Sequence, residues 1–234
     1  MLVCAEVGIN HNGDMNLSHE LIRQASINGA DLVKFQLYEP KELFKDEPHL
    51  IEEAELCSIS YDDFKRIIDW CHEESIEPFF SVFDDSRFEW TENEGIERYK
   101  IASRTMKKTP EFAKRIADTG KDIYVSTGMV DLKECKSILS GYENANFVYC
   151  VSKYPSEYSD YKQPQKYHGG EWMGLSDHTL GIENCLLAVA RGATFIEKHF
   201  TLSKAMEGSD HKCSMTPDEL YDLKKYSKLI GKLL

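Results

Sequence analysis

Residues 174–179 read Gly-Leu-Ser-Asp-His-Thr, and residues 196–201 read Ile-Glu-Lys-His-Phe-Thr. Each run is short and strand-like, and each ends in a polar cluster that contains a histidine. A single segment of helical length, residues 183–191, separates them, so the stretch predicts two successive βα units. If the two strands are parallel neighbours, His178 and His199 emerge side by side at the same edge of a sheet.

The two histidines admit two interpretations. Imidazole nitrogens bind divalent manganese, iron and zinc, and a site with two protein nitrogens leaves positions open for water and substrate. Alternatively, each histidine caps its own strand through a hydrogen bond, which is the commoner role for a single histidine in such a position. The matching positions of His178 and His199 favour the metal site.

The same βα unit repeats along the chain. Apolar and β-branched runs predict eight strands, at residues 2–9, 32–38, 78–83, 98–103, 122–128, 146–151, 172–176 and 195–200. Helical spacing of apolar residues predicts helices at residues 16–28, 61–74, 86–94, 110–119, 132–139, 183–191 and 217–234. Residues 39–58 form a looser stretch, and residues 154–170 lack apolar periodicity.

These eight units predict an α/β fold, a (β/α)8 TIM barrel. Each unit takes about 29 residues, the length of one βα unit. The strands are nearly continuous apolar runs, as in a parallel sheet covered on both faces. Because such a barrel usually needs about 250 residues, we expect one domain over residues 1–234. The alternative is an open doubly wound sheet, which would carry fewer strands and a glycine-rich first turn that residues 8–11 do not supply.

Composition restricts the partners and the compartment. The formal net charge of −12 argues against nucleic acid as a partner, but a few converging lysines can still create a pocket for a small anion. The seven cysteines are odd in number and form no C-x-x-C pair, which predicts reduced thiols. We see no signal region and no apolar run of roughly 18 residues. We therefore expect a cytoplasmic protein without membrane contact.

Polar residues at the carboxyl ends of the strands are the candidates for a site, because the active site of this fold is built there. Lys34 and Lys100 lie within apolar strands, where burying an ammonium group is costly unless an anion compensates it. One interpretation pairs them with Glu6 or Glu197. The other directs them at an anionic substrate, and the serines at other strand ends favour a pocket for phosphate and carboxylate groups.

Six motifs, in the same order, resemble the N-acetylneuraminate (sialic acid) synthase family. They are residues 5–13, 33–36, 99–103, 126–129, 174–181, and 196–201 with 208–211. The resemblance runs in register over essentially the whole chain. Any one motif is weak evidence, whereas six in order are highly specific.

The resemblance implies an enzyme, a metal-dependent transferase. The family condenses phosphoenolpyruvate with the open aldehyde form of an N-acetyl amino sugar, N-acetylmannosamine or a relative. The products are a nine-carbon (nonulosonic) acid and phosphate. The implied cofactor is a divalent metal ion, with manganese first and magnesium, cobalt or zinc as alternatives.

The resemblance also assigns residues to roles. It makes His178 and His199 the metal ligands. It implies catalytic roles for Glu6, Lys34, Lys100 and Asp210. It implies contacts with the two substrates for Gln36, Ser103, Thr105, Ser126, Ser152, Tyr154 and Ser176.

Three positions depart from the family pattern. The family usually has a glutamate two residues after the serine of the fourth strand, and this chain has Thr105. A threonine cannot act as a carboxylate base, so proton transfer would fall to Glu6, Asp177, Asp210 or metal-bound water, or would be impaired. In the sixth-strand motif, Ser152 replaces an asparagine and Tyr149 a histidine.

The domain organisation also differs from the family pattern. We expect this chain to lack the C-terminal antifreeze-like domain that, in the family, covers the partner's site across a dimer. A homodimer and a separate capping protein both remain open. Two alternative functions also remain open: a phosphoenolpyruvate-dependent synthase acting on a different aldose, and a barrel that binds phosphoenolpyruvate or a sugar phosphate without turnover.

Overall fold

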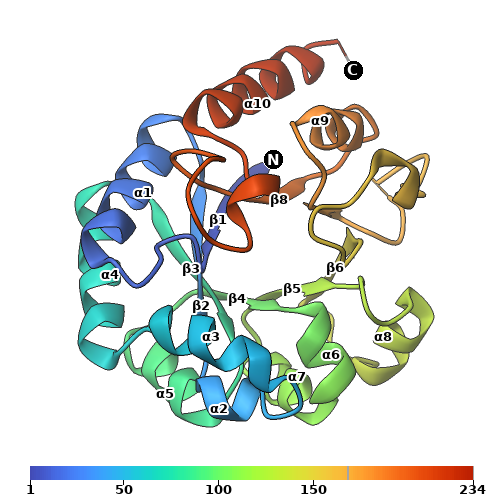
Figure 1. The fold of residues 1–234 in the computed structure, drawn as a ribbon. Coiled ribbons are helices and arrows are strands. Elements are labelled where there is room, and N and C mark those ends of the chain that lie inside the picture. Colours follow the sequence, from blue (N-terminus) through green and yellow to red (C-terminus); the bar gives the residue numbers. More distant parts are fainter. Residues whose placement is uncertain (168, 234) are drawn as a thin grey trace.

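The computed structural model describes residues 1–167 and 169–233. Its strands are β1 (Leu2–Gly8), β2 (Leu32–Leu37), β3 (Glu77–Val82), β4 (Arg98–Ile101), β5 (Asp122–Ser126), β6 (Ala145–Cys150), β7 (Gly174–Asp177) and β8 (Phe195–His199). They are hydrogen-bonded in chain order and close into a parallel barrel, with helices in an outer ring (Figure 1). The predicted (β/α)8 barrel is confirmed, and the pairing of β1 with β8 excludes an open sheet.

The helices alternate with the strands over most of the chain. They are α1 (Met15–Ile27), α2 (Pro40–Leu43), α3 (Ile51–Leu56), α4 (Tyr61–Glu73), α5 (Asp85–Asn93), α6 (Ser103–Lys108), α7 (Pro110–Ala117), α8 (Leu132–Ile138), α9 (Glu183–Ala190) and α10 (Pro217–Ile230). Short 3-10 turns lie at η1 (Pro48–Leu50), η2 (Tyr158–Asp160) and η3 (His211–Cys213). In the described part of the chain, no helix combines the length and the apolar character needed to cross a bilayer.

Local side-chain chemistry sets where the longer helices begin. Thr216 opens α10 with a capping box, because its hydroxyl accepts from the Glu219 amide while the Glu219 carboxylate accepts from the Thr216 amide. Asp14, Ser60 and Asp84 accept backbone N–H groups in the same way at the starts of α1, α4 and α5. These caps satisfy amides that would otherwise lack partners at the helix N-termini.

Two segments differ from the sequence prediction, and a third agrees with it. The fourth strand ends at Ile101, and Ser103, expected at its end, opens α6 instead. Residues 39–58, expected as a looser stretch, contain α2, η1 and α3. Between β6 and β7, the described residues form only η2 and no α-helix, which agrees with the lack of apolar periodicity there.

The barrel interior is arranged in layers because alternate residues of a strand point inward. A lower apolar layer fills the barrel with Cys4, Leu32, Phe79, Tyr124, Val148 and Phe195. Two residues further along the same strands, the inward positions are polar or titratable: Glu6, Lys34, Ser81, Ser126, Cys150 and Glu197. The apolar layer therefore closes the floor beneath a polar layer that faces the carboxyl ends of the strands.

Candidate active site

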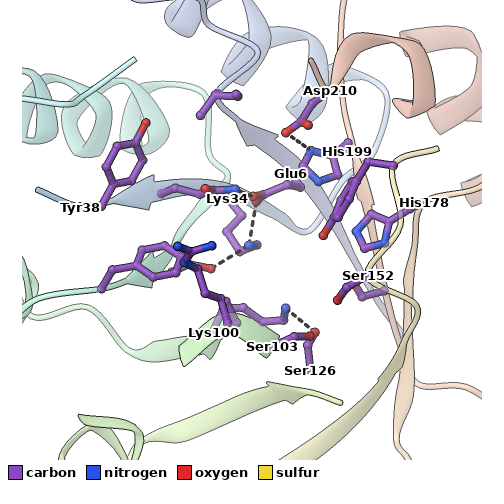
Figure 2. Close-up of a pocket in the computed structure, with 18 of the residues that line it drawn as sticks. Glu6, Lys34, Tyr38, Lys100, Ser103, Ser126, Ser152, His178, His199 and Asp210 are labelled. Atoms are coloured by element: carbon purple, nitrogen blue, oxygen red, sulfur yellow. Dashed lines mark hydrogen bonds and ion pairs between the residues drawn. The ribbon is translucent and has the colours of Figure 1, made fainter. Parts of the chain in front are cut away.

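A cavity of about 430 Å³ opens above the polar layer at the carboxyl ends of the strands. Every residue predicted for the site except Thr105 lines it: Glu6, Lys34, Gln36, Lys100, Ser103, Ser126, Ser152, Tyr154, Ser176, His178, His199 and Asp210. Figure 2 shows the labelled members of this set converging from different strands and loops. Barrel closure is what brings together residues that lie far apart in the sequence.

Thr105 lies apart from this set. It sits on α6, is buried, and its hydroxyl has no hydrogen-bond partner among the described residues. It lines a neighbouring depression with Glu39 and Lys108 instead of the central cavity. Since α6 begins at Ser103, residues 103 and 105 lie two positions apart on a helix, and their side chains therefore point to different faces of it.

The two buried lysines share one carboxylate. Lys100 Nζ lies 3.0 Å from Glu197 Oε1, and Lys34 Nζ lies 3.6 Å from Glu197 Oε2 and 2.9 Å from Glu6 Oε2. Burial alone would raise the pKa of Glu197, but Lys100 and Lys34 outweigh burial and lower that pKa to about 2. Burial alone would lower the pKa of Lys34, but Glu197 and Glu6 raise it. The expected pairing with Glu6 and Glu197 is therefore present, inside the cavity.

Serine hydroxyls complete the cluster. Lys34 donates to Ser81 Oγ at 2.9 Å, Lys100 donates to Ser126 Oγ at 2.7 Å, and Ser176 donates to Glu197 Oε1 at 2.8 Å. An ammonium group carries three donors, and among the described residues Lys100 uses two of them, on Glu197 and Ser126. Lys100 can therefore direct one more N–H at a ligand in the cavity.

The two predicted metal ligands lie close together. The ring centroids of His178 and His199 are 5.5 Å apart, and the Tyr154 ring lies 4.1 Å from that of His178. His178 Nδ1 lies 2.7 Å from the Val151 carbonyl oxygen. Because that oxygen can only accept, Nδ1 carries the hydrogen, and in the neutral ring Nε2 then has the lone pair.

His199 presents a second nitrogen without a hydrogen bond. Its Nδ1 is buried, has no hydrogen-bond partner among the described residues, and lies 3.5 Å from Asp210 Oδ2. Within residues 1–167 and 169–233, no three or more His, Cys, Asp or Glu side chains are grouped as a metal site. A cation at this pair would therefore take two nitrogens from the chain and its other ligands from water or substrate.

Asp177 was a candidate for proton transfer, and the structure corrects this. Ser176 points into the barrel, so the next side chain on β7 points outward. There Lys198 Nζ lies 2.6 Å from Asp177 Oδ2, and Thr179 and Asn184 also donate to the carboxylate. Burial alone would raise the pKa of Asp177, but Lys198 outweighs it and lowers the pKa. Asp177 is a buried structural partner. Of the three carboxylates considered for proton transfer, Glu6 and Asp210 line the cavity.

Several lining residues had no role in the sequence prediction. The segment after β2 forms one wall with Leu43, Phe44, Leu50, Glu53 and Ala54, and Arg104 and Ser209 add to the rim. Cys150 also lines the cavity, where His178 and Lys100 lower the pKa of its thiol against the effect of burial. The position of residues 39–58 directly after a strand end was the one available signal that they belong to the site.

Comparison with known proteins supports the family resemblance and the barrel fold. The NeuB family matches residues 21–234. The N,N'-diacetyllegionaminic acid synthase of Campylobacter jejuni is 34% identical, over 94% of this chain and 73% of its own length. The N-acetylneuraminate-9-phosphate synthase of Homo sapiens is 29% identical, over 99% of this chain and 70% of its own. The crystal structure of N-acetylneuraminic acid synthetase from Leptospira borgpetersenii, in complex with citrate, has a TM-score of 0.93 and 29% identity, over 99% of this chain and 84% of that one.

The structural role of Asp177 can be tested through its partner. Lys198→Met leaves the Asp177 carboxylate buried without a counter-ion, so we expect the free energy of unfolding to fall by about 3–5 kcal/mol. The double variant Asp177→Asn, Lys198→Met removes both charges and should lose less. Guanidinium chloride denaturation measures both, with Lys228→Met, on the exposed face of α10, as the control. Equal losses in the single and double variants would contradict the pairing.

Proposed function

The chain belongs to the NeuB family, and on this premise we propose that it condenses phosphoenolpyruvate with the open-chain aldehyde of an N-acetyl amino sugar. One water molecule is consumed as the bond between the phosphoenolpyruvate carbon skeleton and its phosphate is broken, and the products are a nonulosonic acid and phosphate. N-acetylmannosamine or a close relative is the sugar. The observation that carries this proposal is a pair of buried ammonium groups, on Lys34 and Lys100, in one cavity with two imidazoles. The ammonium groups suit an anion and the imidazoles suit a cation.

In this proposal, phosphoenolpyruvate lies against the polar layer. Lys100 offers its remaining N–H to an anionic oxygen, and Lys34 adds a second positive charge. Ser103 also lines the cavity. Its Oγ accepts from the Gly128 amide at 3.0 Å, and its hydrogen, which is directed at Cys150 Sγ at 3.9 Å, can turn to the ligand. The reacting methylene carbon would then face the two histidines.

We propose that His178 and His199 hold a divalent ion, manganese first, with magnesium, cobalt or zinc as alternatives. The lone pair at His178 Nε2 and the buried, unbonded Nδ1 of His199 fit such a cation. When bound, the ion acts as a Lewis acid toward the aldehyde oxygen of the sugar. The imidazoles of His178 and His199 lie at the edge of the cavity opposite Tyr38 (Figure 2).

Of the carboxylates that line the cavity, we assign different tasks to Glu6 and Asp210. Both carboxylate oxygens of Glu6 have partners. Oε2 lies 2.9 Å from Lys34 Nζ, and Oε1 accepts from the Gln36 amide at 2.9 Å, so Glu6 orients these two groups. Asp210 has looser contacts, with His199 Nδ1 at 3.5 Å and the Ser209 hydroxyl at 3.4 Å. Asp210 is therefore better suited to exchange a proton with the sugar as the carbonyl oxygen becomes a hydroxyl.

We place this reaction in the cytoplasm. All seven cysteines are buried and free of disulfides. Free thiols persist in reducing compartments.

Phosphate release tests the reaction itself. The protein, manganese, phosphoenolpyruvate and a panel of aldoses are mixed, and free phosphate and 2-keto acid are measured. We expect equal amounts of both with N-acetylmannosamine or another N-acyl amino sugar, since one condensation forms one of each. Turnover only with an unrelated aldose would favour a different synthase, and binding of phosphoenolpyruvate without phosphate release would favour a non-catalytic barrel.

Metal content tests the two histidines. We expect the double variant His178→Ala, His199→Ala to retain about tenfold less manganese than the unchanged protein, because both nitrogens are lost. Atomic spectroscopy after dialysis measures this without any assay of activity. His49→Ala, His72→Ala removes two exposed histidines and serves as the matched control. Equal manganese in all three proteins would refute the site.

Calorimetry tests the anion pocket. Lys100→Ala is expected to weaken phosphoenolpyruvate binding by about 2–5 kcal/mol, because the variant loses a donor to the ligand and leaves Glu197 with one fewer counter-charge. Lys107→Ala, one turn beyond the cavity on α6 and exposed, should bind as the unchanged protein does. Unchanged affinity in Lys100→Ala would make Lys100 a purely structural residue.

A further inference from the structure

The loop that carries Asp210 lies outside the regular elements of the barrel. This segment, residues 200–210, connects β8 with η3, and we call it the Asp210 loop. Barrel closure fixes Lys34 and His199, because each lies on a strand. Asp210 has no such support, and its carboxylate has only long contacts, 3.5 Å to His199 Nδ1 (Figure 2) and 3.4 Å to the Ser209 hydroxyl. Other residues must therefore hold Asp210 in place.

Asn12, in the loop after β1, contacts the Asp210 loop. Its Nδ2 donates to the Glu207 carbonyl oxygen at 2.8 Å, and its Oδ1 lies 3.2 Å from Nε2 of the buried His211. On the other side of the ring, His211 Nδ1 lies 2.7 Å from Oγ1 of the buried Thr201. Thr201 lies at the start of the Asp210 loop, and His211 directly follows its end. Asn12 and His211 therefore join both ends of this loop to the loop after β1.

The direction of each of these hydrogen bonds follows from the Glu207 carbonyl group. That oxygen can only accept, so the amide nitrogen of Asn12 faces it, and Asn12 Oδ1 is left to accept from His211 Nε2. His211 Nδ1 then accepts the hydroxyl hydrogen of Thr201, which lies closer to it than to the Ser203 carbonyl oxygen at 3.0 Å. Burial lowers the pKa of His211 against the effect of Asp210, which favours the neutral ring that this arrangement requires.

The backbone of both loops fits this pair of side chains. Asn12 has a φ of 51°, in the left-handed region that asparagine adopts more readily than most residues. Gly208 has a φ of 136°, and a Cβ atom there would lie 2.8 Å from His211 Cδ2 and 3.1 Å from Asn12 Oδ1. Glycine at this position therefore lets the Asp210 loop pass close to Asn12 and His211.

A second set of contacts fixes the main chain of Asp210. Ser214 Oγ donates to the Asp210 carbonyl oxygen at 2.8 Å. Asn10 Nδ2 donates to Ser214 Oγ at 2.8 Å and to the Phe200 carbonyl oxygen at 2.9 Å. Asn10 lies in the same loop as Asn12, so two asparagines of one loop support the main chain on either side of the Asp210 carboxylate.

We infer that Asn12 and His211 are positioning residues for the proposed reaction, which hold the Asp210 carboxylate beside His199. This inference rests on the proposed function, in which Asp210 exchanges a proton with the sugar. Neither Asn12 nor His211 lines the cavity, so both act through Asp210 and not by touching a substrate. The lysines of the anion pocket lie on strands, so the binding of phosphoenolpyruvate does not depend on this support.

The variant Asn12→Gly tests the inference, because glycine adopts a φ of 51° without strain and only the amide is lost. With the aldose that gives the highest turnover, we expect kcat to fall about tenfold and KM for phosphoenolpyruvate to stay within about twofold. Formation of 2-keto acid measures both. Asn28→Gly removes an amide that donates to the Gln24 carbonyl at the end of α1, and kcat should not change. Unchanged kcat in Asn12→Gly would overturn the inference.

A double-mutant cycle separates positioning from general damage to the fold. If Asn12 acts through Asp210, adding Asn12→Gly to Asp210→Asn should lower kcat by no more than about twofold further. A further tenfold loss would show that Asn12 acts elsewhere and would overturn the inference. Full activity of Asp210→Asn would instead count against the role of Asp210 in the proposed function.

Two variants test His211 in the same assay. His211→Leu removes both nitrogens and should lower kcat about as much as Asn12→Gly. His211→Gln keeps an N–H donor for Asn12 Oδ1 and should retain more of the activity. Equal losses in the two variants would overturn the assignment of the effect to this hydrogen bond.

Hydrogen–deuterium exchange decides the inference if the unchanged protein turns over no aldose, a result that would itself count against the proposed function. We expect the amides of residues 200–210 to exchange faster in Asn12→Gly than in Asn28→Gly, because the Asp210 loop loses its contact with the loop after β1. Equal exchange in the two variants would overturn the inference.

Discussion

A buried ammonium group inside a barrel needs a counter-charge, and Glu197 supplies it to both Lys34 and Lys100. With Glu6, these residues make a cluster of two positive and two negative charges above an apolar floor. The cluster is neutral by itself, so it can exist without a substrate. For the same reason it cannot offset the charge of phosphoenolpyruvate alone. The proposed function therefore needs a further cation, and the two histidines at the edge of the cavity are suited to hold it.

Most of the fold could be predicted from the sequence because a parallel barrel requires a simple sequence pattern, namely apolar strands at even spacing. Strands covered on both faces are apolar throughout, and eight such runs at even spacing leave few other topologies. The site followed from the same pattern, since closure brings all strand ends to one face. Strand periodicity alone is enough to place Lys34, Ser126 and His199 in the cavity, because each is a polar residue at an inward position of its strand.

The structure differs from the prediction in two kinds of place. One is where a shift of one residue along a strand changes the direction of a side chain, and the other is where a helix is short. Ser176 and Asp177 are neighbours at one strand end, and only the phase of β7 directs the first inward and the second toward Lys198. The family resemblance implied a substrate contact for Thr105, but β4 ends at Ile101 and Thr105 lies on α6, outside the central cavity. Helices α2 and α3 span four and six residues, too few for a helical repeat of apolar positions to be recognised.

The deep end and the mouth of the cavity are built from different elements, strands and loops respectively. The two ends can therefore recognise different parts of the substrates. The deep end consists of strand residues whose positions are fixed by barrel closure. The mouth depends on contacts between loops: Arg104, after β4, holds Glu47, and Ser209, after β8, holds Glu53. Since loops tolerate change better than strands, the sugar specificity can vary while the anion pocket stays the same. These loops also contact one another, so replacing the segment after β2 alone would leave Arg104 and Ser209 without their partners. A change of sugar therefore requires matched changes in the loops after β2, β4 and β8.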